Sequence, residues 1–356
     1  MEEKSLMQKS LTSLNNFFFA ENQSPVLGIL RVTLVLLFVN IHRYYYLMDS
    51  FTFASTEAAY IQKPSLLIKL LSVPFPLAKA YAGAFAGVYY ATAFCAFIGL
   101  LTRPALLLFA FLNIYIFDIT ESRGLFDHGG SLVTQVFIIL AFAPGSTRFS
   151  LDRVLRWALK GPGKDIRSFY QAMIGSPAPV WGMKTILILL ACTYCTAGLS
   201  KLRYSGIKWV DGQTLTHYLG GRAQYNEGEN RPMFIGPRVV PEVDKWKDGY
   251  GIYSYTYGNW QSSERWRAVG KRIASNSVVM TAISTATLLF ELCGFMILIS
   301  GWPRILYLIG AIGMHKVIGQ LMRLPFTEYQ LICFLFIDWQ FLYQWLHNKL
   351  KHRSAT

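Results

Sequence analysis

Long apolar runs alternate along this chain with short polar or basic segments. Eight of the runs are close to the ~20 residues that a helix needs to cross the ~30 Å hydrocarbon layer of a membrane. The expected spans cover about 26–47, 78–101, 103–120, 128–145, 181–201, 277–300, 303–322 and 326–347. The sequences Thr102-Arg103-Pro104 and Gly301-Trp302-Pro303 are typical of tight turns between antiparallel helices. We therefore predict an all-α membrane protein with about eight transmembrane helices.

Basic residues gather in two polar segments, the loop 146–180 and the tail 348–356, and predict how the chain is oriented. They are Arg148, Arg153, Arg156, Lys160, Lys164, Arg167, Lys349, Lys351 and Arg353. Because short cytoplasmic loops are enriched in Lys and Arg, both segments and both termini are expected in the cytoplasm of a cell-membrane protein. An N-terminal segment over 1–24 then precedes a membrane domain over 25–347. Within that domain, residues 202–276 are expected to form an extracytoplasmic cap, rich in tyrosine and tryptophan, between the fifth and sixth spans.

The composition agrees with a membrane location and argues against other classes. Of the 356 residues, 53% are hydrophobic and 15% are charged, whereas soluble domains carry about 25% charged residues. Basic loops and lipid headgroups account for the net charge of +14, and no nucleic-acid-binding motif accompanies it. Membrane lipid is thus an expected partner, and nucleic acid is not. No metal is predicted, because the histidines lack metal-ligand spacing.

Ionisable residues inside apolar runs are costly to bury, and each is a functional candidate for that reason. The candidates are Arg31, Asp118, His128, Lys201, Glu291 and His315. The predicted orientation gathers Asp118, His128 and Lys201 at the outer membrane face. Glu291 and His315 lie near the middle of their spans, where they can face the same cavity. A lysine, two histidines and a glutamate at one depth suit proton transfer, with the unprotonated amine of the lysine as base.

Structural alternatives stay open for these residues. Lys201 at the end of its span can extend its ammonium group to the lipid headgroups. Arg31 and Glu291 can pair with each other across two helices. Cys192 and Cys195 form a C-x-x-C sequence, which we interpret as helix packing in preference to redox chemistry, because Cys192 does not share the helix face of Lys201.

Three groups of residues resemble one family. Tyr194-Cys195-Thr196-Ala197-Gly198-Leu199-Ser200-Lys201-Leu202 is followed by Trp209-Val210-Asp211-Gly212. His128 is followed by an apolar run, Pro144-Gly145 and Ser150-Leu151-Asp152, and Glu291 by Gly294-Phe295 and His315. Over about 25–347 the chain resembles the transmembrane domain of the vitamin K-dependent γ-carboxylases, also called the horizontally transferred transmembrane domain.

The resemblance implies a function for several residues. Lys201 takes the place of the carboxylase base, which deprotonates vitamin K hydroquinone. The hydroquinone or another quinol then reacts with oxygen to give an alkoxide that removes the γ-proton of a peptide glutamate before carbon dioxide is captured. His128 takes the place of an important family histidine. Beyond these two carry-overs, His315 and Glu291 join the catalytic set because of their place within the spans, and Arg31, Asp118, Trp209 and Asp211 are the residues expected to bind substrate or cofactor.

The resemblance also has departures, which leave other functions open. Carboxylases continue into a large lumenal domain, whereas here only residues 348–356 follow the last expected span. Short bacterial members of the superfamily include proteins needed to mature an exported toxin peptide. A maturation or immunity factor that binds an exported peptide is therefore the alternative to a carboxylase-like enzyme. A proton-relaying transporter is the third hypothesis, but it favours inverted repeats, and none is evident in the sequence.

Overall fold

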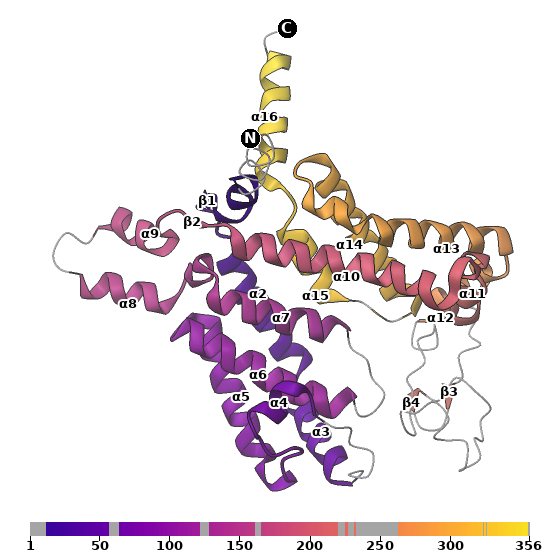
Figure 1. Ribbon diagram of the computed structural model, residues 1–356, viewed down its shortest axis with the longest axis horizontal. Coiled ribbons are helices and arrows are strands. Elements are labelled where there is room, and N and C mark those ends of the chain that lie inside the picture. The colour runs from indigo at the N-terminus through magenta and orange to yellow at the C-terminus, as the bar shows by residue number, and fades with distance from the viewer. Residues whose placement is uncertain are drawn as a thin grey trace, which may run out of the picture. The chain divides into compact units, whose positions relative to one another are not determined.

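The computed structural model describes residues 12–56, 64–121, 128–160, 165–219, 225–226, 231–232, 263–322, 324 and 326–354. Helices dominate these residues, as predicted (Figure 1). The chain divides into two compact units, Met1–Ile186 and Leu187–Thr356. The division lies within helix α10 (Trp181–Ser205), which contributes its first residues to one unit and the remainder to the other.

Apolar helices build the first unit around a core of buried aliphatic and aromatic side chains. They are α2 (Val26–Ile41), α3 (Tyr44–Thr56), α4 (Leu66–Leu70), α5 (Ala82–Ile98), α6 (Thr102–Glu121) and α7 (His128–Phe142). Two short amphipathic helices follow, α8 (Leu151–Leu159) and α9 (Ile166–Ile174). Strands β1 (Glu21–Asn22) and β2 (Ala178–Pro179) pair antiparallel. Phe38, Phe109 and Phe137 are fully buried where the helices meet, and the Phe137 ring contacts each of the other two edge to face.

The second unit combines the C-terminal part of α10 with further helices. They are α11 (Gln213–Leu219), α12 (Glu264–Ala274), α13 (Ser277–Leu292), α14 (Trp302–Met322), α15 (Thr327–Leu335) and α16 (Trp339–Ser354). The short strands β3 (Tyr225–Asn226) and β4 (Arg231–Pro232) pair antiparallel. Leu219, Met280 and Leu321 form a buried cluster, which Trp266 of α12 covers.

Five helical segments among the described residues are long and apolar enough to cross a membrane. They are Lys79–Ile98, Thr102–Thr120, Trp181–Asp211, Ser277–Leu298 and Trp302–Met322. The run expected over 26–47 is a bent pair, Val26–Ile41 with Tyr44–Thr52, whose two helices meet at 55° and which would make a sixth span. The chain therefore carries several helices suited to a membrane. Orientation and the position of the termini stay predictions.

Two further expected spans also differ from a single long helix. The run at 128–145 gives a shorter apolar helix, Gly130–Phe142. The run at 326–347 is divided between α15 and α16, because Asp338 sits at the break instead of inside a helix. Asp338 accepts a hydrogen bond from the Phe341 amide and lies 3.9 Å from Arg304, so this carboxylate starts α16. Most of the expected cap, including residues 233–262, lies outside the described residues.

Candidate functional site

An ion pair joins α10 to α13 inside the second unit. The Nζ atom of Lys201 lies 2.8 Å from Oε1 of Glu291 and 2.7 Å from Oε2. The two side chains are 21% and 10% exposed, so both charges are largely removed from solvent. Lys201 therefore does not simply extend its ammonium to the headgroups. The ammonium and the carboxylate compensate each other, because either charge would be costly to bury on its own helix without the other.

Close contact between the two helices explains why these residues meet. Gly198 lies one turn before Lys201, and a Cβ at Gly198 would be 3.1 Å from the backbone nitrogen and two side-chain carbons of Leu292. Leu292 directly follows Glu291. Cys195 adds a contact from its Sγ to the Leu292 carbonyl, 3.7 Å away. A Cβ this close to Leu292 would be an unusually tight contact, so glycine favours the close approach of the helices that brings the ammonium and the carboxylate together.

Trp209 covers the ion pair from the 3₁₀ turn Gly206–Asp211 that follows α10. The ammonium of Lys201 lies 5.1 Å from the centre of the indole ring, within the range of a cation–π interaction. The Nε1 atom of Trp209 is buried and has no hydrogen-bond partner among the described residues. A buried donor of this kind is normally satisfied, so its free N–H is available to an oxygen of a bound molecule.

Asp211, predicted to bind substrate, has a local partner. Its Oδ1 accepts a hydrogen bond of 2.8 Å from the Gln213 amide at the start of α11. Its carbonyl oxygen lies 3.4 Å from the Thr281 hydroxyl of α13. Asp211 is exposed, and these contacts make it a capping residue that ends the turn carrying Trp209. The geometry thus gives Asp211 a positioning role.

His315 belongs to a second polar cluster of the same unit. Its Nε2 lies 2.7 Å from the Tyr194 hydroxyl, which is 3.8 Å from Sγ of Cys333. The Nδ1 atom of His315 is buried and has no hydrogen-bond partner among the described residues. Tyr194 and Lys201 are seven residues apart and share a face of α10, about 10 Å apart along the helix axis. Sequence reasoning placed His315 beside Lys201 and missed Tyr194 as a site residue, although their shared helix face was a usable signal.

Three predicted site residues lie in the first unit. Arg31 is fully buried, and its Nη2 donates to the carbonyls of Arg148 and Phe149 at 3.4 and 2.9 Å. The Arg31 guanidinium is thus bound by backbone carbonyls of its own unit, whereas Glu291 binds Lys201 within the second unit. Asp118 accepts a hydrogen bond of 2.8 Å from the Ser65 amide, which precedes α4.

His128 is the first residue of α7, and its side chain lies outside the described part of the chain. Within the described ranges, no group of three or more His, Cys, Asp or Glu residues is placed to hold a metal ion. All five cysteines are free thiols; Cys192 is exposed, whereas Cys333 is buried. The candidate site therefore consists of the Lys201–Glu291 pair with Trp209, and the Tyr194–His315 pair further along α10.

Comparison with protein-family models, curated proteins and solved structures finds no match to this chain. The resemblance to the γ-carboxylases therefore rests on the sequence groups described above. No role of a residue follows from the comparisons, so the functional argument depends on the geometry of the two clusters.

Proposed function

We propose that this chain is a membrane enzyme in which Lys201 removes a proton from the hydroxyl of an apolar substrate, with a quinol of the vitamin K hydroquinone type as the favoured class. The observation that carries this proposal is the Lys201–Glu291 pair, a titratable amine and a carboxylate held 2.7–2.8 Å apart with little solvent exposure. Proton transfer needs a donor and an acceptor at this separation.

The pair can supply the free amine that a base requires. In its ionic form Lys201 is an ammonium and cannot accept a proton. Transfer of one proton from Nζ to a Glu291 oxygen gives a neutral amine and a neutral carboxylic acid, a form that low polarity favours relative to water. The free Nζ then takes the hydroxyl proton of the substrate: the O–H bond breaks, an N–H bond forms, and the substrate oxyanion remains beside the new ammonium.

The surroundings of the pair fit an aromatic substrate with a hydroxyl group. The indole of Trp209 offers a flat apolar surface near the amine, and its buried Nε1–H is free to donate to an oxygen. When bound, a quinol supplies the oxygen-dependent chemistry that carboxylases use to generate a strong base. The resemblance extends the proposal to modification of a peptide glutamate by such a base.

One observation favours a second candidate. The ammonium of Lys201 already contacts both Glu291 oxygens, so the resting pair is satisfied without a substrate. A satisfied pair is also what a purely structural link between α10 and α13 requires. This feature supports a non-catalytic role for the pair, for which the alternative is a maturation or immunity factor that binds an exported peptide.

Oxygen uptake by the purified protein with added vitamin K hydroquinone separates the two candidates. The variants are Lys201→Ala, Lys201→Arg and Glu291→Gln, and Lys316→Ala is the matched control, because Lys316 is an exposed lysine of the apolar helix α14. The enzyme proposal expects uptake with quinone epoxide formation in the wild type and in Lys316→Ala, and its loss in both Lys201 variants.

Two outcomes count against the proposal. Uptake that persists in Lys201→Arg would show that a titratable amine is not needed, because arginine stays charged. Absence of uptake with any hydroquinone tested would leave the peptide-binding candidate as the better account.

A further inference from the structure

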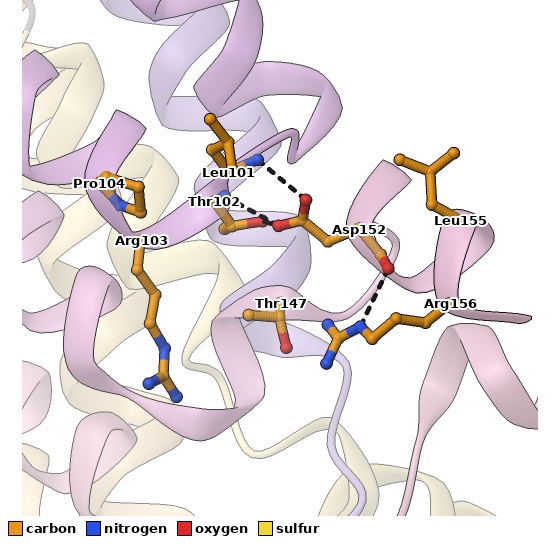
Figure 2. A pocket seen from close by; sticks show the side chains of 8 residues that line it. All are labelled: Leu101, Thr102, Arg103, Pro104, Thr147, Asp152, Leu155 and Arg156. Atoms are coloured by element: carbon orange, nitrogen blue, oxygen red, sulfur yellow. Dashed lines mark hydrogen bonds between the residues drawn. The ribbon is translucent and has the colours of Figure 1, made fainter. Parts of the chain in front are cut away.

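A cavity of about 610 Å³ lies in the first unit, apart from the clusters described above. It forms where the turn between α5 and α6 meets α8 (Figure 2). The apolar side chains Leu101, Pro104 and Leu155 line it together with the cationic Arg103 and Arg156. In the view of Figure 2, Thr147 lies between the two arginine side chains. The combination of two cations with an apolar wall is uncommon on a soluble surface and suits an amphipathic ligand.

The ends of the neighbouring helices place this cavity at a membrane boundary. One membrane-crossing segment ends at Ile98 and the next begins at Thr102. Gly99 to Leu101 therefore form the turn at which the chain leaves and re-enters the apolar layer. A cavity at this turn lies at headgroup depth in either orientation of the protein.

The acidic residue of the cavity, Asp152, already accepts hydrogen bonds from neighbouring groups. Asp152 accepts hydrogen bonds from the amides of Leu101 and Thr102, both 2.9 Å, and from the Thr102 hydroxyl at 2.7 Å. Its carboxylate thus compensates the partial positive charge at the N-terminus of α6. Arg156 directs only its Nε to the Asp152 carbonyl, 3.0 Å away. Both guanidinium groups therefore keep N–H donors for an anion.

Exposed apolar side chains continue outward from the cavity. Leu101 is 66% exposed and Leu155 of α8 is 45% exposed, and Leu159 at the end of α8 and Ile166 at the start of α9 are more than four-fifths exposed. Basic residues alternate with them along α8. A helix with this division between apolar and basic residues is typical of one that lies in the membrane interface.

The walls of the cavity are fixed by the fold. Gly99 has a φ of +71°, and a Cβ there would collide with Ser150 and with the Arg31 guanidinium. The carbonyl of Gly99 accepts a hydrogen bond of 3.0 Å from the Asp152 amide. Arg31 binds the Phe149 carbonyl from inside the unit. These contacts hold the start of α8 against the turn, so the two arginines are presented on a preformed site.

We propose that this cavity binds the headgroup of an anionic glycerophospholipid, with the phosphate held by Arg103 and Arg156. The acyl chains extend along Leu101, Pro104 and the outer face of α5 and α6. Arginine suits this role because its planar guanidinium donates two parallel hydrogen bonds to phosphate oxygens. The site acts as a specific lipid contact at one membrane surface and is independent of the proposed chemistry at Lys201.

The test uses the full-length protein in phosphatidylcholine nanodiscs with and without phosphatidylglycerol. Retained lipid is counted by native mass spectrometry, and thermal unfolding is followed in parallel. The test variant is Arg103→Gln with Arg156→Gln. The matched control is Lys160→Gln with Arg167→Gln, which removes the same charge from exposed positions of the same segment outside the cavity.

Phosphatidylglycerol is expected to be retained and to raise the unfolding temperature of the wild type and of the control. The test variant is expected to bind phosphatidylglycerol about tenfold more weakly, which corresponds to the loss of about one charge-assisted hydrogen bond. Arg103→Gln alone is a second test, because the exposed Arg103 side chain can be replaced with little risk to folding; a reduced affinity is expected there too.

Three results would overturn the proposal. An equal loss in the control variant would mean that diffuse attraction to a basic segment explains the binding. Equal retention in the wild type and the Arg103→Gln variant would show that the cavity is not involved. Stabilisation by inorganic phosphate or glycerol 3-phosphate in detergent, equal to that by phosphatidylglycerol, would assign the cavity to a free phosphate compound instead of a lipid.

Discussion

Tyr194 and His315 share a hydrogen bond of 2.7 Å two helical turns from the Lys201–Glu291 pair, so one face of α10 carries two separate polar contacts to other helices. One contact involves formal charges, and the other is formed by a phenol and an imidazole. Their separation along the helix allows each to be removed without direct loss of the other. The following predictions depend on this independence.

Replacing Tyr194 by Phe should lower the free energy of unfolding by about 1–2 kcal/mol, because the buried Nε2 of His315 loses its partner. Tyr204→Phe, an exposed tyrosine of the same helix, should have almost no effect. Stability is measured by denaturant titration in mixed micelles. Quinol-dependent oxygen uptake, if present, should fall less in Tyr194→Phe than in Lys201→Ala; an equal fall would contradict the independence of the two clusters.

The Lys201–Glu291 pair should show a coupling free energy of about 1–2 kcal/mol in a double-mutant cycle. The cycle combines Lys201→Met and Glu291→Gln and uses the same unfolding measurement. A second cycle on Arg304 and Asp338, whose charged atoms are 3.9 Å apart, provides the comparison. Its coupling should be smaller, because Coulomb attraction and hydrogen bonding both weaken with distance. Equal values in the two cycles would argue against a special role for the first pair.

Gly198→Leu should separate α10 from α13 and destabilise the protein by about 1–3 kcal/mol, because the added side chain has no space beside Leu292. The same substitution at Gly313 of α14 is the control, since a Cβ at Gly313 meets no atom within 4 Å. Labelling of Lys201 by an amine-specific reagent reports on the ion pair. Labelling should increase in Gly198→Leu and stay unchanged in Gly313→Leu.

Asp152 should make stability depend on pH in the acid range. Burial alone would raise the pKa of Asp152, but the hydrogen bonds from Thr102 and Leu101 bring that pKa below its usual value of 3.8. A lowered pKa in the folded state means that the ionised carboxylate stabilises the fold above the usual value, and that this stabilisation disappears as the pH falls through the lowered pKa.

The wild type should therefore be more stable than Asp152→Asn by about 1 kcal/mol at neutral pH, as expected for a lost capping contact. The difference should shrink below about pH 4. Unfolding temperatures of both proteins between pH 3 and pH 7 provide the measurement. A difference that is constant over this range would show that the Asp152 charge does not stabilise α6.

Much of the fold could be predicted because the length of an apolar run is enough to indicate a membrane helix. The hairpins at Thr102 and Gly301 also followed from local turn chemistry, and both are present. The break at Asp338 could not be predicted, because the sequence does not reveal whether a charge within an apolar run lies inside a helix or ends it. The contact with Arg304 decides this, and it depends on how α14 and α16 pack.

The candidate site, like the fold, could be predicted from the sequence only where local patterns are sufficient. Charges within apolar runs marked Lys201, Glu291 and His315 as unusual, but spacing alone could not tell which of them pair. Gly198 permits the close approach at which Lys201 meets Glu291, and the Tyr194 hydroxyl on the same helix face hydrogen-bonds to His315. Asp118 was chosen for its charge and Asp211 for the motif that follows Lys201, yet each accepts a hydrogen bond from a backbone amide near the start of a helix. The Asp211 contact is local, whereas the Asp118 contact joins residues 53 positions apart and depends on the tertiary fold.

The close contact at Gly198 has a consequence for engineering the site. A Cβ at Gly198 would be equally close to the backbone nitrogen and to two side-chain carbons of Leu292, so the distance between α10 and α13 depends on both positions. The spacing of the amine and the carboxylate is therefore tied to residues 198 and 292. In the proposed enzyme, substitutions meant to change substrate binding should therefore leave these two positions unaltered.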